Sequence, residues 1–162
     1  MSHPFSLPQQ LKAVIGLAPA ADAGGRTATY VSLKNAHKAF IVVQITQGNA
    51  ATVALTPYQA KTVAAGSEKV LANVVAVYAN LDAAASDVLV RATDAVNYTT
   101  DAGVKNKIIV FEIDPASLDV NNGFDCLTIK TGASNAANIT SVLYLLGPHR
   151  YPQASLGSAI VD

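Results

Sequence analysis

The sequence has little charge, one cysteine and no tryptophan. The single cysteine, Cys126, excludes an intramolecular disulfide and fits synthesis in a reducing compartment. Charged residues make up 14% of the 162 residues, whereas ordinary domains contain about a quarter. The formal net charge of zero disfavours a protein that binds nucleic acid through its phosphates. Because so few charges solvate a monomer poorly, we expect a surface that is largely covered by other protein.

Long apolar runs are also missing. No stretch approaches the roughly 18 apolar residues that a membrane span needs. Pro4 and Pro8 interrupt the N-terminal region where a signal peptide would carry its apolar segment. We therefore expect no membrane partner and synthesis in the cytoplasm. With 51% apolar residues, a chain of this length can still bury a sizeable core.

The side chains that bind metals or act as nucleophiles are few and scattered. The three histidines are His3, His37 and His149, and none has a second histidine at metal-ligand spacing. Cys126 has no base beside it in the sequence, so a small buried hydrophobe explains it better than a catalytic thiolate.

Acidic residues give no recognisable site either. Glutamate occurs only at Glu68 and Glu112, and Glu112 is expected to point to solvent or to a cross-strand lysine. The turn from Asp119 to Asp125 offers oxygen ligands for calcium, but Lys130 stands where an EF-hand needs its bidentate glutamate. No phosphate loop or nucleophile elbow is present. We predict no catalytic residue, no cofactor and no metal site, and a protein that is not an enzyme.

Short β-rich segments separated by turn residues fill the middle of the chain. Two of them, residues 40–47 and 52–56, flank Gly48 and Asn49 and predict a hairpin. The predicted strands are residues 29–33, 40–47, 52–56, 74–78, 88–91, 96–99, 107–114, 126–131 and 139–146. This spacing predicts an all-β fold, a β-sandwich or jelly roll of about seven to nine short strands.

Proline and glycine near both ends predict arms beside a compact body. We expect an N-terminal arm over residues 1–25 with a short helix from Pro8 to Ile15, a sandwich body over 26–147, and an extended C-terminal arm over 148–162. Such arms either bury their apolar residues on a neighbouring subunit or are simply frayed. The candidate interface residues in the arms are Phe5, Leu7, Leu11, Tyr151, Leu156 and Ile160.

Framework stretches of the body resemble a family of small virion proteins from tailed bacteriophages and prophages. The stretches are residues 30–35, 44–53, 98–101, 110–114 and 124–132. The resemblance covers about residues 26 to 147 and includes no functional motif. It implies a head decoration (cement) protein, a sandwich or jelly roll that is often trimeric and lies outside the capsid lattice. Its partners would be further copies of itself and the major capsid protein.

Two alternatives stay open at this point. The same sandwich could serve as another virion part, such as a head fibre base, a tail component or a baseplate piece. It could also be a module that binds a glycan or a host receptor. Sandwiches bind glycans through exposed aromatic side chains, and here the tyrosines Tyr58, Tyr78, Tyr98 and Tyr151 are spread over several predicted elements.

Overall fold

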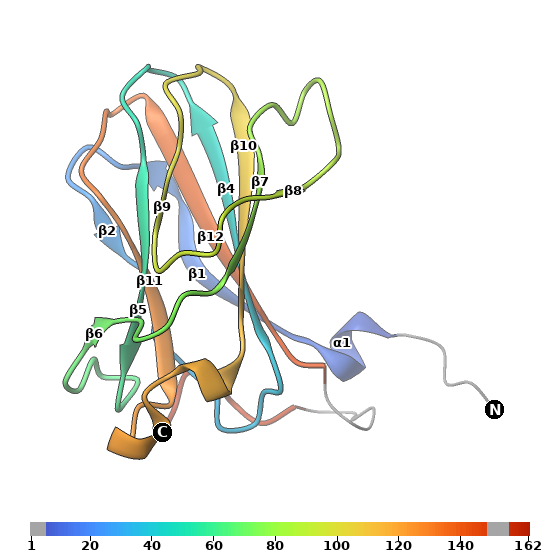
Figure 1. Cartoon of the computed structure of the whole chain (residues 1–162), viewed down its shortest axis with the longest axis vertical. Coiled ribbons are helices and arrows are strands. Elements are labelled where there is room, and N and C mark those ends of the chain that lie inside the picture. Colours follow the sequence, from blue (N-terminus) through green and yellow to red (C-terminus); the bar gives the residue numbers. More distant parts are fainter. Residues whose placement is uncertain (1–5, 149–155) are drawn as a thin grey trace.

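The chain folds into two antiparallel sheets of six strands each, packed face to face as a sandwich (Figure 1). The computed structural model describes residues 6–148 and 156–162. Sheet A has the strand order β1 (Lys12–Ala21), β12 (Asn138–Leu146), β4 (Ala39–Gln47), β10 (Asn106–Ile113), β7 (Ala76–Asn80), β8 (Val90–Arg91). The predicted all-β sandwich is confirmed.

Sheet B is built around β11 (Cys126–Thr131), which pairs with three other strands. Its order is β2 (Arg26–Thr27), β11, β5 (Ala54–Ala60), β6 (Lys69–Val70), with β3 (Val31–Ser32) paired to β11 and β9 (Tyr98–Thr99) paired to β5. The described helices are short: α1 (Leu7–Gln10), η1 (Pro115–Ser117) and η2 (Val120–Asn122). Seven strands have five residues or more and five have two, so the predicted count of seven to nine holds for the longer strands.

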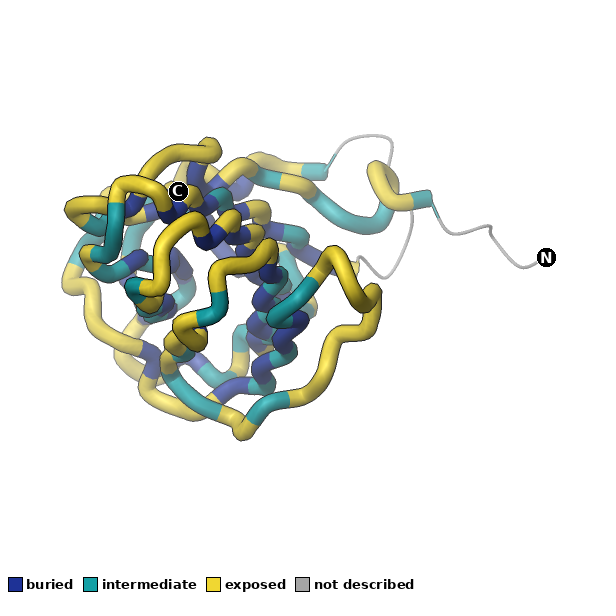
Figure 2. Tube along the Cα trace, turned by 90° about the horizontal axis from the view of Figure 1, so that it is seen from above, coloured by how far each residue is buried: buried dark blue, intermediate teal, exposed yellow. Residues whose placement is uncertain are grey.

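The core lies between the two sheets and is built from alternate residues of each long strand. In β4, Ile41, Val43 and Ile45 have no exposed surface, while the residues between them face away. In β10 the same alternation buries Ile109 and Phe111. A strand places successive side chains on opposite faces, so this pattern fixes which face of sheet A meets sheet B. Figure 2 shows the buried residues inside a shell of exposed loops.

The predicted hairpin between residues 40–47 and 52–56 is wrong. Both segments form strands, but β4 pairs with β10 and β12 in sheet A, whereas β5 pairs with β11 in sheet B. The Gly48–Val53 connection therefore crosses from one sheet to the other. The predicted strand over residues 52–56 is longer in the structure, where β5 continues through Pro57, opposite Ile129 of β11, to Ala60.

The predicted N-terminal arm is wrong from Lys12 onward. The helix ends at Gln10, and Lys12–Ala21 forms the ten-residue edge strand β1, paired along its length with β12. Val14 packs against the core and Ile15 points outward, which is the alternation of a strand and not the spacing of a helix. The edge of β12 holds these residues as a strand, because pairing between distant segments overrides a weak local preference for helix.

The described part of the predicted C-terminal arm lies against its own sandwich. Ser32 donates its backbone N–H to the carbonyl of Ala159 at 2.7 Å, and Ala159 is buried in the core. Lys12 Nζ donates to the carbonyl of Leu156 at 2.9 Å. The backbone N–H of Val63 donates to the Asp162 carboxylate at 3.2 Å. Residues 156–162 therefore close one end of the sandwich.

Candidate functional site

The outer face of sheet A carries a row of large side chains that crosses five strands. Ile15 lies opposite Leu143, and Leu143 lies opposite Val42. Val42 in turn lies opposite Val110, and Val110 opposite Tyr78. Residues directly opposite one another in antiparallel strands point to the same face. Because the neighbouring residues in these strands form the core, this row lies on the face turned away from sheet B.

Further residues above and below the row extend it into a patch, which we call the apolar face. The apolar face consists of Ile15, Phe40, Val42, Tyr78, Ile108, Val110, Leu143 and Leu145. Ile15 is 68% exposed and Leu143 is 38% exposed. The other members are half-buried by their neighbours in the sheet. Strands that are apolar on both faces are typical of sheets covered on both faces.

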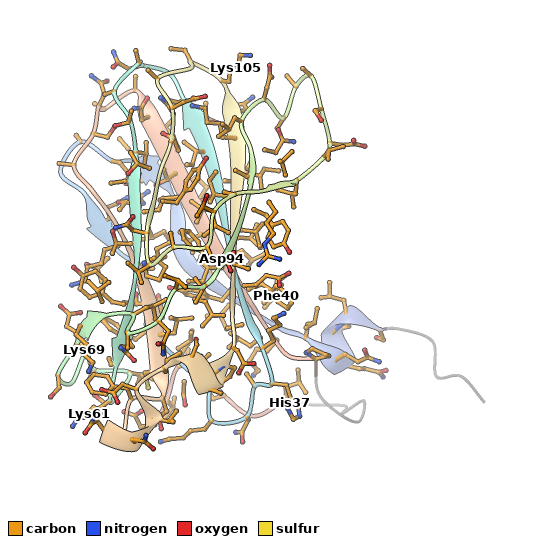
Figure 3. The ribbon with its side chains drawn as sticks, viewed as in Figure 1. His37, Phe40, Lys61, Lys69, Asp94 and Lys105 are labelled. Atoms are coloured by element: carbon orange, nitrogen blue, oxygen red, sulfur yellow. The ribbon has the colours of Figure 1, made fainter. Side chains whose placement is uncertain are left out.

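The charges bordering the apolar face are already paired within the chain. Lys38 Nζ lies 3.0 Å from the Glu112 carboxylate and 5.8 Å from the centre of the Phe40 ring. Arg91 lies 3.0 Å from the Asp94 carboxylate, and its guanidinium lies 6.0 Å from the centre of the Tyr78 ring. Figure 3 labels Phe40 and Asp94 in the same region of the view. These two cations of the described residues therefore add no unpaired charge beside the apolar face.

Sheet B has an outer face of the opposite character. Lys130 lies 2.5 Å from the Glu68 carboxylate and 4.4 Å from the centre of the Tyr58 ring. Tyr30 also donates its hydroxyl to Glu68. The hydrogen bonds from Lys130 and Tyr30 lower the pKa of Glu68, and burial with the neighbouring carboxylate raises the pKa of Tyr30. This face is polar, so only one of the two sheets turns an apolar surface outward.

No third layer covers the apolar face in the part of the chain that the structure describes. The two sheets account for the twelve strands, and the helices there have three or four residues. Of these helices, α1 contacts β1 at the edge of sheet A. Nor does any helix among the described residues have the length and apolar character needed to cross a bilayer. Among the described residues, the apolar face is therefore an apolar surface that no other element of the chain covers.

The four predicted interface residues that the structure describes lie near the ends of the chain, and none of them belongs to the apolar face. Leu7 is 45% exposed in α1, and Leu11 is half-buried just before β1. Leu156 is half-buried, while Ile160 is 52% exposed and lines one shallow groove together with Ile15. Phe5 and Tyr151 lie outside the described residues.

Among the described residues, the side chains considered for catalysis are not assembled into a site. Burial and the adjacent Asp125 raise the pKa of the Cys126 thiol to about 12, so the nucleophilic thiolate is disfavoured. His37 is exposed, whereas His3 and His149 lie outside the described residues. Across residues 6–148 and 156–162, no group of histidine, cysteine and acidic side chains is arranged to hold a metal ion.

Two buried charged groups fasten the sandwich together. Asp22 has no exposed surface and accepts hydrogen bonds from Arg26 Nε at 2.8 Å and from the Thr131 hydroxyl at 2.9 Å. Lys107, also fully buried, donates to Gln47 Oε1 at 2.8 Å and to the Asp101 carboxylate. Because these contacts join β11 and β12 to Asp22 and join β4 to β10, we assign both clusters to stability.

The sequence already contained the signal for the apolar face. The runs Phe40–Val43, Ile108–Phe111 and Val142–Leu146 are apolar at every position, whereas a strand with one solvated face should alternate. The sequence analysis predicted strands over these runs and placed the candidate interface residues in the arms. It missed that three adjacent strands of one sheet would place half of these residues on an uncovered face.

Known proteins offer a distant structural likeness to this chain. No protein-family model matches it, and no curated protein matches it. Among solved structures, the chain is similar to the SPBc2 prophage-derived protein YomS, with a TM-score of 0.49 and 9% sequence identity. The similarity covers 85% of this chain and 93% of YomS. This similarity concerns the backbone structure alone, and we draw no conclusion about function from it.

Proposed function

We propose that this protein is a structural component of a tailed-bacteriophage virion, and that it decorates the outside of the capsid and stabilises it. The observation that carries the proposal is the apolar face of sheet A, a contact surface wide enough to cross five strands and free of unbalanced charge. The resemblance of the body to small virion proteins supports the setting.

The sandwich suits a mechanical task. Its two sheets enclose a continuous core, and buried charged clusters at Asp22 and Lys107 join separate strands. A rigid body of this kind transmits load between the neighbours that it contacts, which a clamp between capsomers requires. Covering the apolar face on the particle removes exposed apolar surface from water, so assembly stabilises both the protein and the shell.

A non-enzymatic role is part of the proposal. The Cys126 thiol is buried with a raised pKa, and the buried carboxylate of Asp22 is saturated by Arg26 and two threonine hydroxyls. These groups hold the fold together and offer no free nucleophile or base in a pocket.

Quantitative mass spectrometry of density-banded particles from the producing culture tests the function. A decoration protein should co-band with the shell at a copy number close to that of the major shell protein. Mild denaturant should release it before the shell collapses. A few copies per particle would assign it instead to a fibre, tail or baseplate. Its presence only in the soluble fraction would contradict a virion role, and a glycan array would then test the binding module.

A further inference from the structure

We infer that the partner of the apolar face is a second copy of this chain, with two outer faces of sheet A packed against each other about a twofold axis. This inference rests on the proposed function, because it names which neighbour on the shell covers the apolar face. The inference uses three observations: the balance of charge on the border, the kinds of side chain on the apolar face, and the size of the apolar face.

The charge balance favours a second copy of the same face as the partner. Both cations on the border, Lys38 and Arg91, are neutralised by acidic groups of their own chain. A partner of opposite charge would gain little here, and an identical face meets no net repulsion. In a twofold pair each copy presents the same patch, so the apolar row of one copy can cross that of the other without an unmatched charge.

The side chains of the apolar face are of the same kinds as those that pack in the core. Sheets stack about 10 Å apart when aliphatic and aromatic side chains interdigitate between them. The apolar face supplies side chains of the same kinds as the inner face of sheet A, such as Val42 and Val110 beside Val43 and Phe111. Two copies joined in this way form a four-layered stack whose outermost surfaces are the polar faces of sheet B.

The size of the face sets the strength of the pairing. From β1 to β7 it crosses four strand spacings of about 4.8 Å, and it extends about 17 Å along the strands, which gives a footprint on the order of 300 Å² per copy. A standard stable interface buries about 800 Å² per partner. We therefore expect a reversible pair in solution that becomes persistent when a shell holds many copies close together.

Sedimentation velocity across a concentration series, from micromolar to millimolar, tests the inference with the intact chain. The wild-type mass should rise from one chain to two. Leu143→Glu and Ile15→Glu place a carboxylate at exposed positions of the apolar face, and each should raise the concentration for half-pairing at least tenfold. Thr56→Glu is the matched control, because Thr56 lies opposite Lys130 on the outer face of sheet B, and it should pair like the wild type.

Several results would overturn the inference. These are a wild-type monomer at every concentration, a trimer, or pairing that Leu143→Glu and Ile15→Glu leave unchanged while both variants keep the wild-type circular dichroism spectrum. None of them bears on the copy number in banded particles, which tests the proposed function separately. If the chain pairs through the apolar face but is absent from particles, the pairing is supported and the virion role is contradicted.

Discussion

Val42 of β4 and Val110 of β10 lie directly opposite each other, and both point away from the core of the sandwich. One residue further along each strand, Val43 and Phe111 point inward and are fully buried. The same pair of strands therefore builds two apolar surfaces, of which sheet B covers only one. This relationship underlies the proposed contact surface and supplies a matched pair of substitutions.

Truncation of the inward residue should destabilise the isolated chain far more than truncation of its outward neighbour. Phe111→Ala removes a fully buried ring and should lower the free energy of unfolding by roughly 3–5 kcal/mol. Val110→Ala, one residue away on the outer face, should cost clearly less. Urea unfolding of dilute protein measures both values. Equal losses would mean that the outer face is as fully packed in the monomer as the core.

The Asp22–Arg26 pair should matter more than an exposed ion pair. Arg26→Ala leaves the buried Asp22 carboxylate without its cation, and also removes the hydrogen bond from Arg26 Nη2 to the Thr140 carbonyl at 2.7 Å. The loss should be roughly 3–5 kcal/mol in the free energy of unfolding. Arg91→Ala breaks the exposed pair with Asp94 and should stay close to wild type. Thermal unfolding of the two variants compares them directly, and similar melting temperatures would contradict a fastening role for Arg26.

Two N-terminal deletions distinguish a dispensable segment from a structural strand. Removal of residues 1–10 stops before β1 and should leave a cooperatively folded sandwich. Removal of residues 1–20 takes away nearly all of β1, exposes the edge of β12 and uncovers the core beside Leu17. Calorimetry should show a large drop in melting temperature or no transition for the second deletion only. A stable fold after the longer deletion would show that β1 is not needed by the sandwich.

Acid should weaken the fold partly through Asp101. The hydrogen bond from the buried Lys107 ammonium lowers the pKa of Asp101 below its ordinary value of 3.8. A carboxylate whose pKa is lowered in the folded state contributes stability above the ordinary value, and this contribution is lost as the pH falls through the folded-state pKa. The free energy of unfolding should therefore decline below pH 3.8, and Asp101→Asn should make that decline shallower. An identical decline in the variant would exclude this contribution.

The sequence predicted the fold class and most strands better than it predicted which strands pair. The pattern of apolar residues located the long strands other than β1, and β11 was predicted over residues 126–131, where the structure has it. Which strands pair is decided by contacts between distant segments. The turn residues at Gly48 and Asn49 therefore predicted a hairpin where the chain changes sheets. For the same reason, Leu11, Val14 and Ile15 had helical spacing although the edge of β12 holds β1 as a strand.

The candidate surface could be predicted only in part. Low charge indicated a protein covered by partners, and it pointed to no particular face. The apolar runs in β4, β10 and β12 carried the missing information. A run that is apolar at every position does not, however, show whether the second face of its strand is covered by protein or exposed. Strand order within sheet A, which brings these three runs side by side, became known only from the structure.

The most direct test of the account compares Tyr78 and Tyr58 by hydroxyl-radical footprinting, in dilute free protein and in density-banded particles. The two tyrosines form a matched pair, because each is half-buried beneath a cation on the outer face of its sheet. If the apolar face is the contact surface, Tyr78 should be strongly protected in particles and Tyr58 should be oxidised nearly as in the free chain. Unchanged oxidation of Tyr78, protection of Tyr58 alone, or absence of the chain from the particles would contradict the account.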